Sequence, residues 1–173
     1  MPLIRQYEES DFNSCRHRLW VQLTERHREI YDAPHIGGDD PGKHFETHLE
    51  AVGPERLWVA ELDGEVVGLT GLIVGDQDTD IEPVSEIEPL VVDDRFRGQG
   101  VGSALIDFLK IHVRTHNLPE IVVKPVARNR LMLEFMAKQG FDTMGTVELI
   151  LRDESSSTKW DFGAEVSGVA FKV

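Results

Sequence analysis

The segment RFRGQGVGSAL, residues 95–105, places a glycine at every second position of its centre and continues directly into a helical pattern of apolar residues. Bare backbone at the start of a helix lets an anion approach main-chain N–H groups, and the positive end of the helix dipole favours negative charge there. The segment therefore predicts a strand, a tight loop and a helix in immediate succession, with an anionic ligand held by the loop.

Two other phosphate-binding motifs do not fit this segment. A P-loop carries a lysine followed by Ser or Thr after its last glycine, whereas Gly102 is followed by Ser103 and Ala104. A dinucleotide-binding loop has two residues before its third glycine, whereas Gly98, Gly100 and Gly102 alternate strictly. The glycines alone therefore do not identify the ligand.

Residues 57–74, LWVAELDGEVVGLTGLIV, carry the clearest strand pattern in the chain. Two runs rich in β-branched and aliphatic residues are joined by Asp63 and Gly64, a dipeptide suited to a tight type I′ turn. The sequence therefore predicts a β-hairpin here.

The remaining patterns alternate between strand and helix. Strand patterns lie at residues 3–7, 84–92, 121–125, 146–152 and 168–173. Helices are predicted from the Ser10-Asp11 cap to before Pro34, over 44–52, from Val101 onward, and from Asn129 to Gly140. Strands that are first paired by a hairpin and then separated by helices favour a mixed sheet with helices on both faces.

The composition is that of one compact domain. The 173 residues are 40% hydrophobic, which suits a single core. A formal net charge of −13 argues against a partner held by its phosphates, such as a nucleic acid. Cys15 is the only cysteine, so no internal disulfide can form, and no apolar run approaches the roughly 18 residues of a membrane span. We therefore expect a cytoplasmic protein that binds neither nucleic acid nor membrane.

Taken with its flanks, the glycine segment resembles the acyl-CoA-binding segment of the GNAT acetyltransferase superfamily. The superfamily pattern of Arg or Gln, two residues, Gly, one residue, and Gly or Ala is met by residues 97–102. A second superfamily motif is matched downstream by Asn129, Phe135, Lys138, Gly140 and Phe141. The two motifs occur in the right order and spacing, and the resemblance covers about residues 57–152.

The resemblance implies a fold and an activity. The fold is α/β, with a mixed central sheet of about six to seven strands flanked by helices and with splayed fourth and fifth strands. Residues 1–173 would form one acetyltransferase domain, with acceptor-side helices in 1–56, the acyl-CoA-binding core in 57–152 and a tail with a last strand in 153–173. The activity is transfer of an acetyl group from the cosubstrate acetyl-CoA to a primary amine of a small molecule or peptide, without a metal.

The physical chemistry of the loop agrees with that implication. CoA carries a pyrophosphate, which N–H groups at the start of a helix can bind, and Ser103, Arg95 or Arg97 can add a contact. In the superfamily the fourth strand bulges and its free backbone holds the pantetheine arm, which would reconcile Pro89 with a strand. The expected acetyl-CoA contacts are Leu90, Val91, Val92, Arg95, Arg97, Gly98, Gln99, Gly100, Val101, Gly102, Ser103, Asn129 and Phe135.

Acetylation of an amine needs a base that removes a proton from the acceptor ammonium. Glu86 and Glu88 are the candidates, because residues two apart on a strand project from the same face, and their mutual repulsion would make one of them a stronger base. Superfamily members often place a glutamate on this strand, which supports the assignment. A solvent-facing acidic strand edge is the alternative.

The usual general acid of the superfamily is a tyrosine one residue after the position of Phe135, and Met136 stands there in this chain. Methionine cannot donate a proton to the leaving thiolate, so water or the acceptor's own proton is the expected substitute. The same departure keeps a second hypothesis open, a non-catalytic acyl-CoA-binding sensor or regulatory domain.

Acidic residues precede the strand of the candidate base, at Asp76, Asp78, Asp80 and Glu82. Such a cluster raises the local concentration of cations, so we expect a cationic amine acceptor. The sequence leaves open which amine this is, and whether the chain is a monomer or a homodimer.

One further motif bears on metal binding. The run HFETH places His44 and His48 on one helix face, but Phe45 stands where a zinc protease needs a glutamate. No metal site is therefore predicted.

Overall fold

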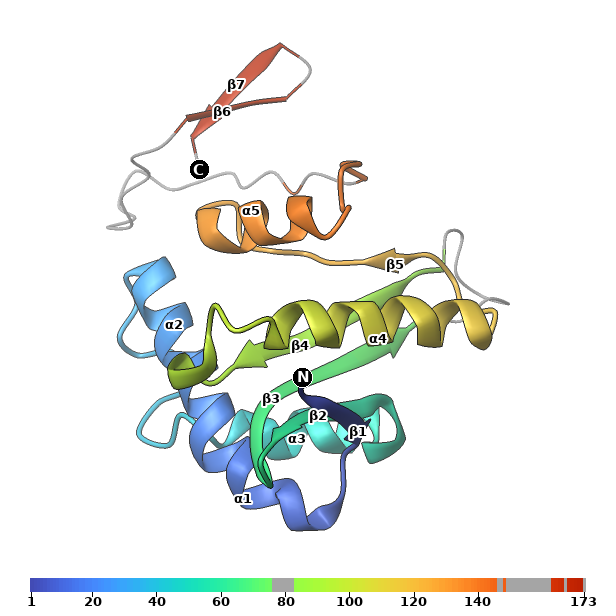
Figure 1. Cartoon of the computed structure of the whole chain (residues 1–173). Coiled ribbons are helices and arrows are strands. Elements are labelled where there is room, and N and C mark those ends of the chain that lie inside the picture. Colours follow the sequence, from blue (N-terminus) through green and yellow to red (C-terminus); the bar gives the residue numbers. More distant parts are fainter. Residues whose placement is uncertain (76–82, 146–147, 149–162, 167, 173) are drawn as a thin grey trace.

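The computed structural model describes residues 1–75, 83–145, 148, 163–166 and 168–172 (Figure 1). The strands are β1 (Leu3–Gln6), β2 (Leu57–Leu62), β3 (Glu65–Val74), β4 (Ser85–Val92), β5 (Ile121–Val122), β6 (Gly163–Val166) and β7 (Val169–Lys172). The α-helices are α1 (Phe12–Ser14), α2 (Val21–Tyr31), α3 (His44–Val52), α4 (Val101–Thr115) and α5 (Arg130–Lys138). Shorter helical segments are η1 (Glu9–Asp11), the π-helical η2 (Cys15–Trp20), η3 (Pro54–Arg56) and η4 (Asp94–Phe96).

The central sheet is mixed and has the strand order β1-β2-β3-β4-β5. The first four strands pair antiparallel, and β5 runs parallel to β4. The prediction of six to seven strands is wrong for the described residues, which give this sheet five. The predicted last strand forms as β7, but it pairs with β6 in a separate two-stranded sheet, and the strand predicted at 146–152 lies outside the described residues apart from Glu148.

The hairpin and most helix predictions are confirmed. Asp63 and Gly64, with φ of 50° and 80°, both adopt the positive φ that a type I′ turn requires. The first predicted helix runs through α1, η2 and α2 and ends at Tyr31, ahead of Pro34. The helix predicted over 44–52 is α3, and Asn129 caps α5 by accepting a hydrogen bond of 3.2 Å from the N–H of Met132.

Alternate residues of a strand point to opposite faces of the sheet. Different helices cover these two faces. One core cluster packs under η2 and α3 and includes Leu19, Phe45 and Leu69. The other packs under α4 and α5 and includes Ile106 and Met136. Figure 1 shows α4 lying along β3 and β4. Among the described residues, no helix is long and apolar enough to cross a membrane.

The pairing of β3 with β4 is interrupted by a bulge. Thr70 pairs with Leu90 and Leu72 with Ile87, so Glu88 and Pro89 together lie opposite one residue of β3, Gly71. A Cβ atom on Gly71 would lie 2.6 Å from the carbonyl oxygen of Glu88, so only glycine fits there. The bulge expected from the resemblance is therefore located at Glu88 and Pro89.

The fourth and fifth strands separate soon after they meet. In the described part of the chain they pair only at Ser85 with Ile121 and at Glu86 with Val122, while β4 continues to Val92. Figure 1 shows the two segments diverging beyond these pairs. Within the described ranges, the backbone edge of β4 that faces away from β3 therefore has no strand partner from the bulge onward.

Candidate active site

The glycine loop adopts a conformation that favours glycine at two positions. Gly98 has a φ of 75°, and Gly100, the N-cap of α4, has a φ of 83°. A Cβ atom built at either residue would meet no atom within 4 Å, so the space beside the loop is open. Bare backbone therefore borders open space at the start of a helix of 15 residues.

The first turn of α4 presents free N–H groups. Ala104 donates to the carbonyl oxygen of Gly100 at 3.0 Å, and among the described residues no acceptor is found for the N–H groups of Val101, Gly102 and Ser103. These donors and the positive end of the helix dipole make the loop suited to an anion.

Three of the expected cofactor contacts, Gly102, Ser103 and Phe135, make structural contacts that hold α5 against α4, and a fourth, Asn129, caps α5. A Cβ atom on Gly102 would lie 3.2 Å from the ring of Phe135, so this glycine permits close helix packing. The hydroxyl oxygen of Ser103 accepts a 3.0 Å hydrogen bond from the side-chain amide of Gln139. Asn129 fixes the start of α5. The sequence did not reveal the contacts between α4 and α5, because they join segments far apart in the chain.

The two arginines of the loop are engaged with carboxylates. The Arg95 guanidinium contacts Asp93 at 2.8 Å and Glu65 at 2.5 Å. Arg97 pairs with Asp94 at 2.6 Å and is half exposed at the loop entrance. Arg97 Nε also donates to the carbonyl oxygen of Val92 at 3.2 Å, so both arginines stabilise the loop while their side chains stay partly exposed.

Asp93, at the end of β4, is the centre of an ion-pair network that the sequence did not predict. Its side chain is fully buried, accepts from the N–H of Arg95 at 3.0 Å and lies 3.2 Å from the guanidinium of Arg18. Its own N–H donates to the carbonyl of Val67 at 2.9 Å. The hydrogen bonds from Arg95 lower the pKa of this carboxyl below its usual value. The network thus fixes the point at which β4 enters the loop.

Replacing Asp93 with Ala is expected to lower the free energy of unfolding by about 2 to 3 kcal/mol at pH 7, because two arginines lose a buried partner but keep solvent contact. Since the folded pKa of this carboxyl is lowered, its contribution is present above the usual aspartate pKa of 3.8 and is lost as the pH falls through the lower folded value. Urea unfolding from pH 7 to pH 3 should show the difference shrinking below about pH 4. Asp94→Ala, at an exposed residue, is the control, and a difference that does not change with pH would contradict this role.

Glu86 and Glu88 lie on the face of the sheet opposite to α4. Ile87 between them packs into the α4-side cluster, so its two neighbours point toward the side of α2 and α3. Glu86 is partly buried and paired with Lys124, which follows β5. Glu88 is exposed and has no Lys or Arg partner within the described residues. The two carboxylates therefore share a face but not an environment.

Two histidines of the acceptor-side helices are subject to the charge of Glu88. His27 of α2 and His48 of α3 are both half-buried, and the charge of Glu88 acts on both rings. No sequence pattern singles out His27, and His48 stands out in the sequence only through the HFETH run. No group of three or more His, Cys, Asp or Glu side chains within the described ranges could hold a metal ion.

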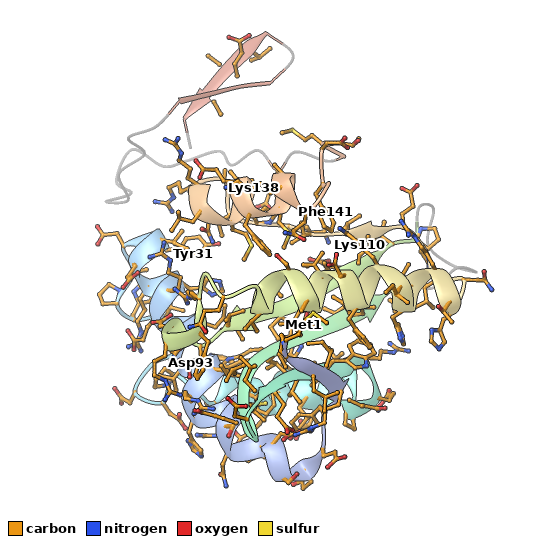
Figure 2. All side chains as sticks on the ribbon, viewed as in Figure 1. Met1, Tyr31, Asp93, Lys110, Lys138 and Phe141 are labelled. Atoms are coloured by element: carbon orange, nitrogen blue, oxygen red, sulfur yellow. The ribbon has the colours of Figure 1, made fainter. Side chains whose placement is uncertain are left out.

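One contact joins the end of α2 to the segment between β5 and α5. The guanidinium of Arg128 lies 5.5 Å from the ring centre of Tyr31. Figure 2 shows Tyr31 at the end of α2 that is nearest to α5. Met136, at the position where the superfamily has its tyrosine, is 3% exposed in the α4-side core.

Comparisons with known proteins place this geometry in a family. The chain is 32% identical over 89 residues to N-acetylaspartate synthetase of Rattus norvegicus, a match that covers 51% of this chain but only 28% of that protein. It resembles the structure of AAC(6')-Iy in complex with the bisubstrate analogue CoA-S-monomethyl-acetylneamine, with a TM-score of 0.61, 17% identity, and 88% and 99% of the two chains covered.

A second solved structure has a similar fold. An aminoglycoside acetyltransferase from an uncultured soil metagenomic sample, in complex with sisomicin, has a TM-score of 0.60 and 19% identity, with 88% of this chain and 95% of that chain covered. At these identities the structures establish the fold alone. Residues 12–141 match the model of the acetyltransferase (GNAT) family. The chain therefore belongs to the acetyltransferase (GNAT) family.

Proposed function

We propose that this protein is an acetyl-CoA-dependent N-acetyltransferase that moves an acetyl group to a primary amine by direct attack. The observation that carries the proposal is the open, left-handed glycine loop at Gly98 and Gly100, which lies at the start of α4. It directly follows a strand whose outer edge pairs with no other described strand beyond Glu86. Together these features supply a site for a pyrophosphate and an adjoining backbone edge for an extended amide-containing arm.

Three parts of the chain would hold acetyl-CoA. The amides of Val101, Gly102 and Ser103 would bind the pyrophosphate, and Arg97 would add a charge-assisted contact at the loop entrance. The backbone edge at Leu90–Val92, on which the carbonyl of Val92 accepts from Arg97 Nε at 3.2 Å, would bond the pantetheine arm. Bound in this way, acetyl-CoA supplies a thioester carbonyl near the bulge of β4.

Glu88 is placed to take a proton from an acceptor ammonium at that bulge. It is exposed and unpaired among the described residues, whereas Glu86 is bound to Lys124. The freed amine would attack the thioester carbonyl, and the second proton of its nitrogen would neutralise the departing thiolate. No tyrosine is needed for this route, which agrees with a buried Met136.

Acetyl transfer can be tested with acetyl-CoA and a panel of amines. We would measure free-thiol release with spermidine, neamine, L-aspartate and a peptide with a free N-terminus. Turnover with at least one amine is expected. If calorimetry shows CoA binding but no amine of a broad panel is acetylated, the second hypothesis, a non-catalytic acyl-CoA sensor, is favoured instead. Met136, at the position of the superfamily's tyrosine, is the reason for this second hypothesis.

We expect cationic amines to be the better acceptors. The chain carries a net charge of −13, and Glu88 adds an unpaired carboxylate at the site, although the cluster at Asp76, Asp78, Asp80 and Glu82 lies outside the described residues. The KM for spermidine should therefore rise with ionic strength, while L-aspartate should be a poor acceptor. Preference for L-aspartate, or a KM for spermidine that ignores salt, would contradict this expectation.

We also propose a cellular compartment for the protein and a measurement of its oligomeric state. A reducing compartment such as the cytoplasm suits a chain whose single cysteine, Cys15, is fully buried as a free thiol. Burial raises the pKa of the Cys15 thiol to about 12, which makes it unreactive. Size measurement in solution would distinguish a monomer from a homodimer.

A further inference from the structure

Two side chains of the acceptor-side helices contact the segment that leads into the glycine loop. Arg18 belongs to the π-helical η2, and Gln22 lies near the start of α2, about one helical turn further on. Their partners lie at the start of β3, just after β4 and in η4, the short helical segment before Gly98. These segments are distant in the sequence, so only the fold brings them together.

Arg18 uses its whole guanidinium for these contacts. One terminal nitrogen lies 2.5 Å from a carboxylate oxygen of Glu65, and the other donates to the main-chain carbonyl oxygen of Val66. Its Nε lies 3.2 Å from Oδ2 of Asp93, the fully buried residue that follows β4 (Figure 2). A planar guanidinium with fixed nitrogens holds three partners in one relative position. Arg18 therefore fixes the end of β4 against the start of β3.

Arg95 reaches the same two carboxylates from the loop side. Its guanidinium contacts Asp93 at 2.8 Å and Glu65 at 2.5 Å, the latter at the oxygen that Arg18 also contacts. Two guanidiniums and two carboxylates thus meet, and their charges balance. Because the group has no net charge, we expect it to affect an anionic ligand through the position of the loop and not through attraction.

Gln22 holds the next residue of the segment by its backbone. Its side-chain oxygen accepts a 3.0 Å hydrogen bond from the N–H of Asp94, the first residue of η4. The first N–H groups of a helical segment have no partner inside it, so an outside acceptor is needed. Gln22 supplies that acceptor from α2 and fixes η4 against this helix.

The glycine part of the loop depends on these outer contacts. Cβ atoms built at Gly98 and Gly100 would meet no described atom within 4 Å, so packing around these two residues does not hold the loop. The side chains of Arg97 and Gln99 donate to main-chain carbonyls at 3.2 and 3.1 Å, but both acceptors belong to the same segment, 92–99. Such bonds shape the segment and do not fix where it lies against the helices.

We propose that Arg18 and Gln22, two residues of the acceptor-side helices, position the glycine loop and so set the affinity for the nucleotide part of acetyl-CoA. Both are positioning residues, because they act through Asp93 and Asp94 and neither is expected to touch the cosubstrate. Donors that bind a ligand keep their geometry only when supporting residues hold them in place. This inference rests on the proposed function, in which the loop holds the pyrophosphate.

The inference is tested by two ligands that differ in the pyrophosphate. Isothermal titration with CoA should show a loss of affinity of about tenfold in Arg18→Met and about threefold in Gln22→Leu, which removes one hydrogen bond. Pantetheine, which lacks the pyrophosphate, would be titrated by NMR of the full chain. Its affinity should change by less than about twofold in both variants, because the loop does not hold it.

Two further variants separate position from charge and from general stability. Arg16→Met is the matched control, because Arg16 lies in the same η2 and pairs with Asp40 at 2.5 Å and Glu46 at 3.0 Å, away from the loop. It should leave CoA affinity within about twofold of the parent. Arg18→Lys keeps the positive charge but cannot hold three partners at once, so it should still weaken CoA binding by about fivefold.

Kinetics with the best amine of the panel give a second readout. In Arg18→Met and Gln22→Leu the KM for acetyl-CoA should rise, while kcat at saturating acetyl-CoA stays within about twofold, because the loop does not touch the reacting atoms. A fall in kcat with an unchanged KM would contradict a role at the loop.

The outcomes distinguish this inference from the proposed function. If the parent binds CoA and Gln22→Leu and Arg18→Met bind it equally well, the positioning role is overturned and the proposed function stands. Equal losses for CoA and pantetheine, a loss in Arg16→Met as large as in Arg18→Met, or full affinity in Arg18→Lys would also overturn it. Gln22→Leu decides the matter even where Arg18→Met does not fold, since it removes one exposed contact. A parent that binds no CoA contradicts the proposed function itself, and the inference fails with it.

Discussion

Replacing Gly100 with Asp is expected to weaken CoA binding by about tenfold to a hundredfold. Gly100 has a φ of 83°, and a Cβ atom there would enter the open space in front of α4. The new side chain adds about 1 kcal/mol of backbone strain and, more importantly, a carboxylate where the pyrophosphate oxygens should lie. Isothermal titration with CoA measures the effect.

Matched variants separate strain from charge. Gly100→Ala adds the strain alone and should weaken binding less than Gly100→Asp. Gly64→Asp is the second control, because Gly64 also has a positive φ, 80°, with open space around it, but lies in the β2–β3 turn. It should lower stability and leave CoA affinity unchanged. Equal affinities for the parent and Gly100→Asp would mean that the loop does not hold the pyrophosphate.

The parts of the fold that the sequence predicted well are those determined by neighbours along the chain. The turn at Asp63 and Gly64 needs two consecutive residues that tolerate positive φ, and this dipeptide meets that requirement. The α3 helix and the Asn129 cap of α5 follow in the same way from periodicity and capping. The glycine loop was recognisable because its conformation depends on residues that are consecutive in the sequence.

The number of strands in the sheet could not be obtained in this way. A strand pattern indicates that a segment is extended, but it does not indicate which other segment it pairs with. β7 has the predicted strand form, yet it pairs with β6 and adds nothing to the central sheet. The bulge was likewise only inferred by resemblance, and its position depends on Gly71, which lies on the other strand.

The site residues show the same difference between features set by neighbouring residues and features set by long-range contacts. Loop glycines were found, whereas the partners of Asp93 were not, because they join elements that meet only in the folded chain. Arg95 shows the same limit, since a basic residue beside a glycine loop predicts a phosphate contact, whereas its ion pairs with Asp93 and Glu65 are visible only in the folded chain.

The largest effect on catalysis is expected from Glu88. Glu88→Gln should lower kcat by about a hundredfold or more, the usual contribution of a general base, because the amide cannot accept the ammonium proton. Glu86→Gln should cost much less, because Glu86 is bound to Lys124 and partly buried. The double variant should match Glu88→Gln alone, and CoA affinity should be unchanged in all three, because neither side chain is expected to touch the phosphates.

Steady-state rates across the pH range, measured with the best amine of the panel, distinguish the outcomes. A base acts on the protonated acceptor, so the deficit of Glu88→Gln should be greatest at neutral pH and shrink as the amine itself loses its proton. A deficit carried by Glu86→Gln would assign the base to the Lys124-paired carboxylate instead. If the double variant acetylates as fast as the parent at every pH, the proton leaves the acceptor by another route, and both glutamates serve only the electrostatics of the surface between β4 and the acceptor-side helices.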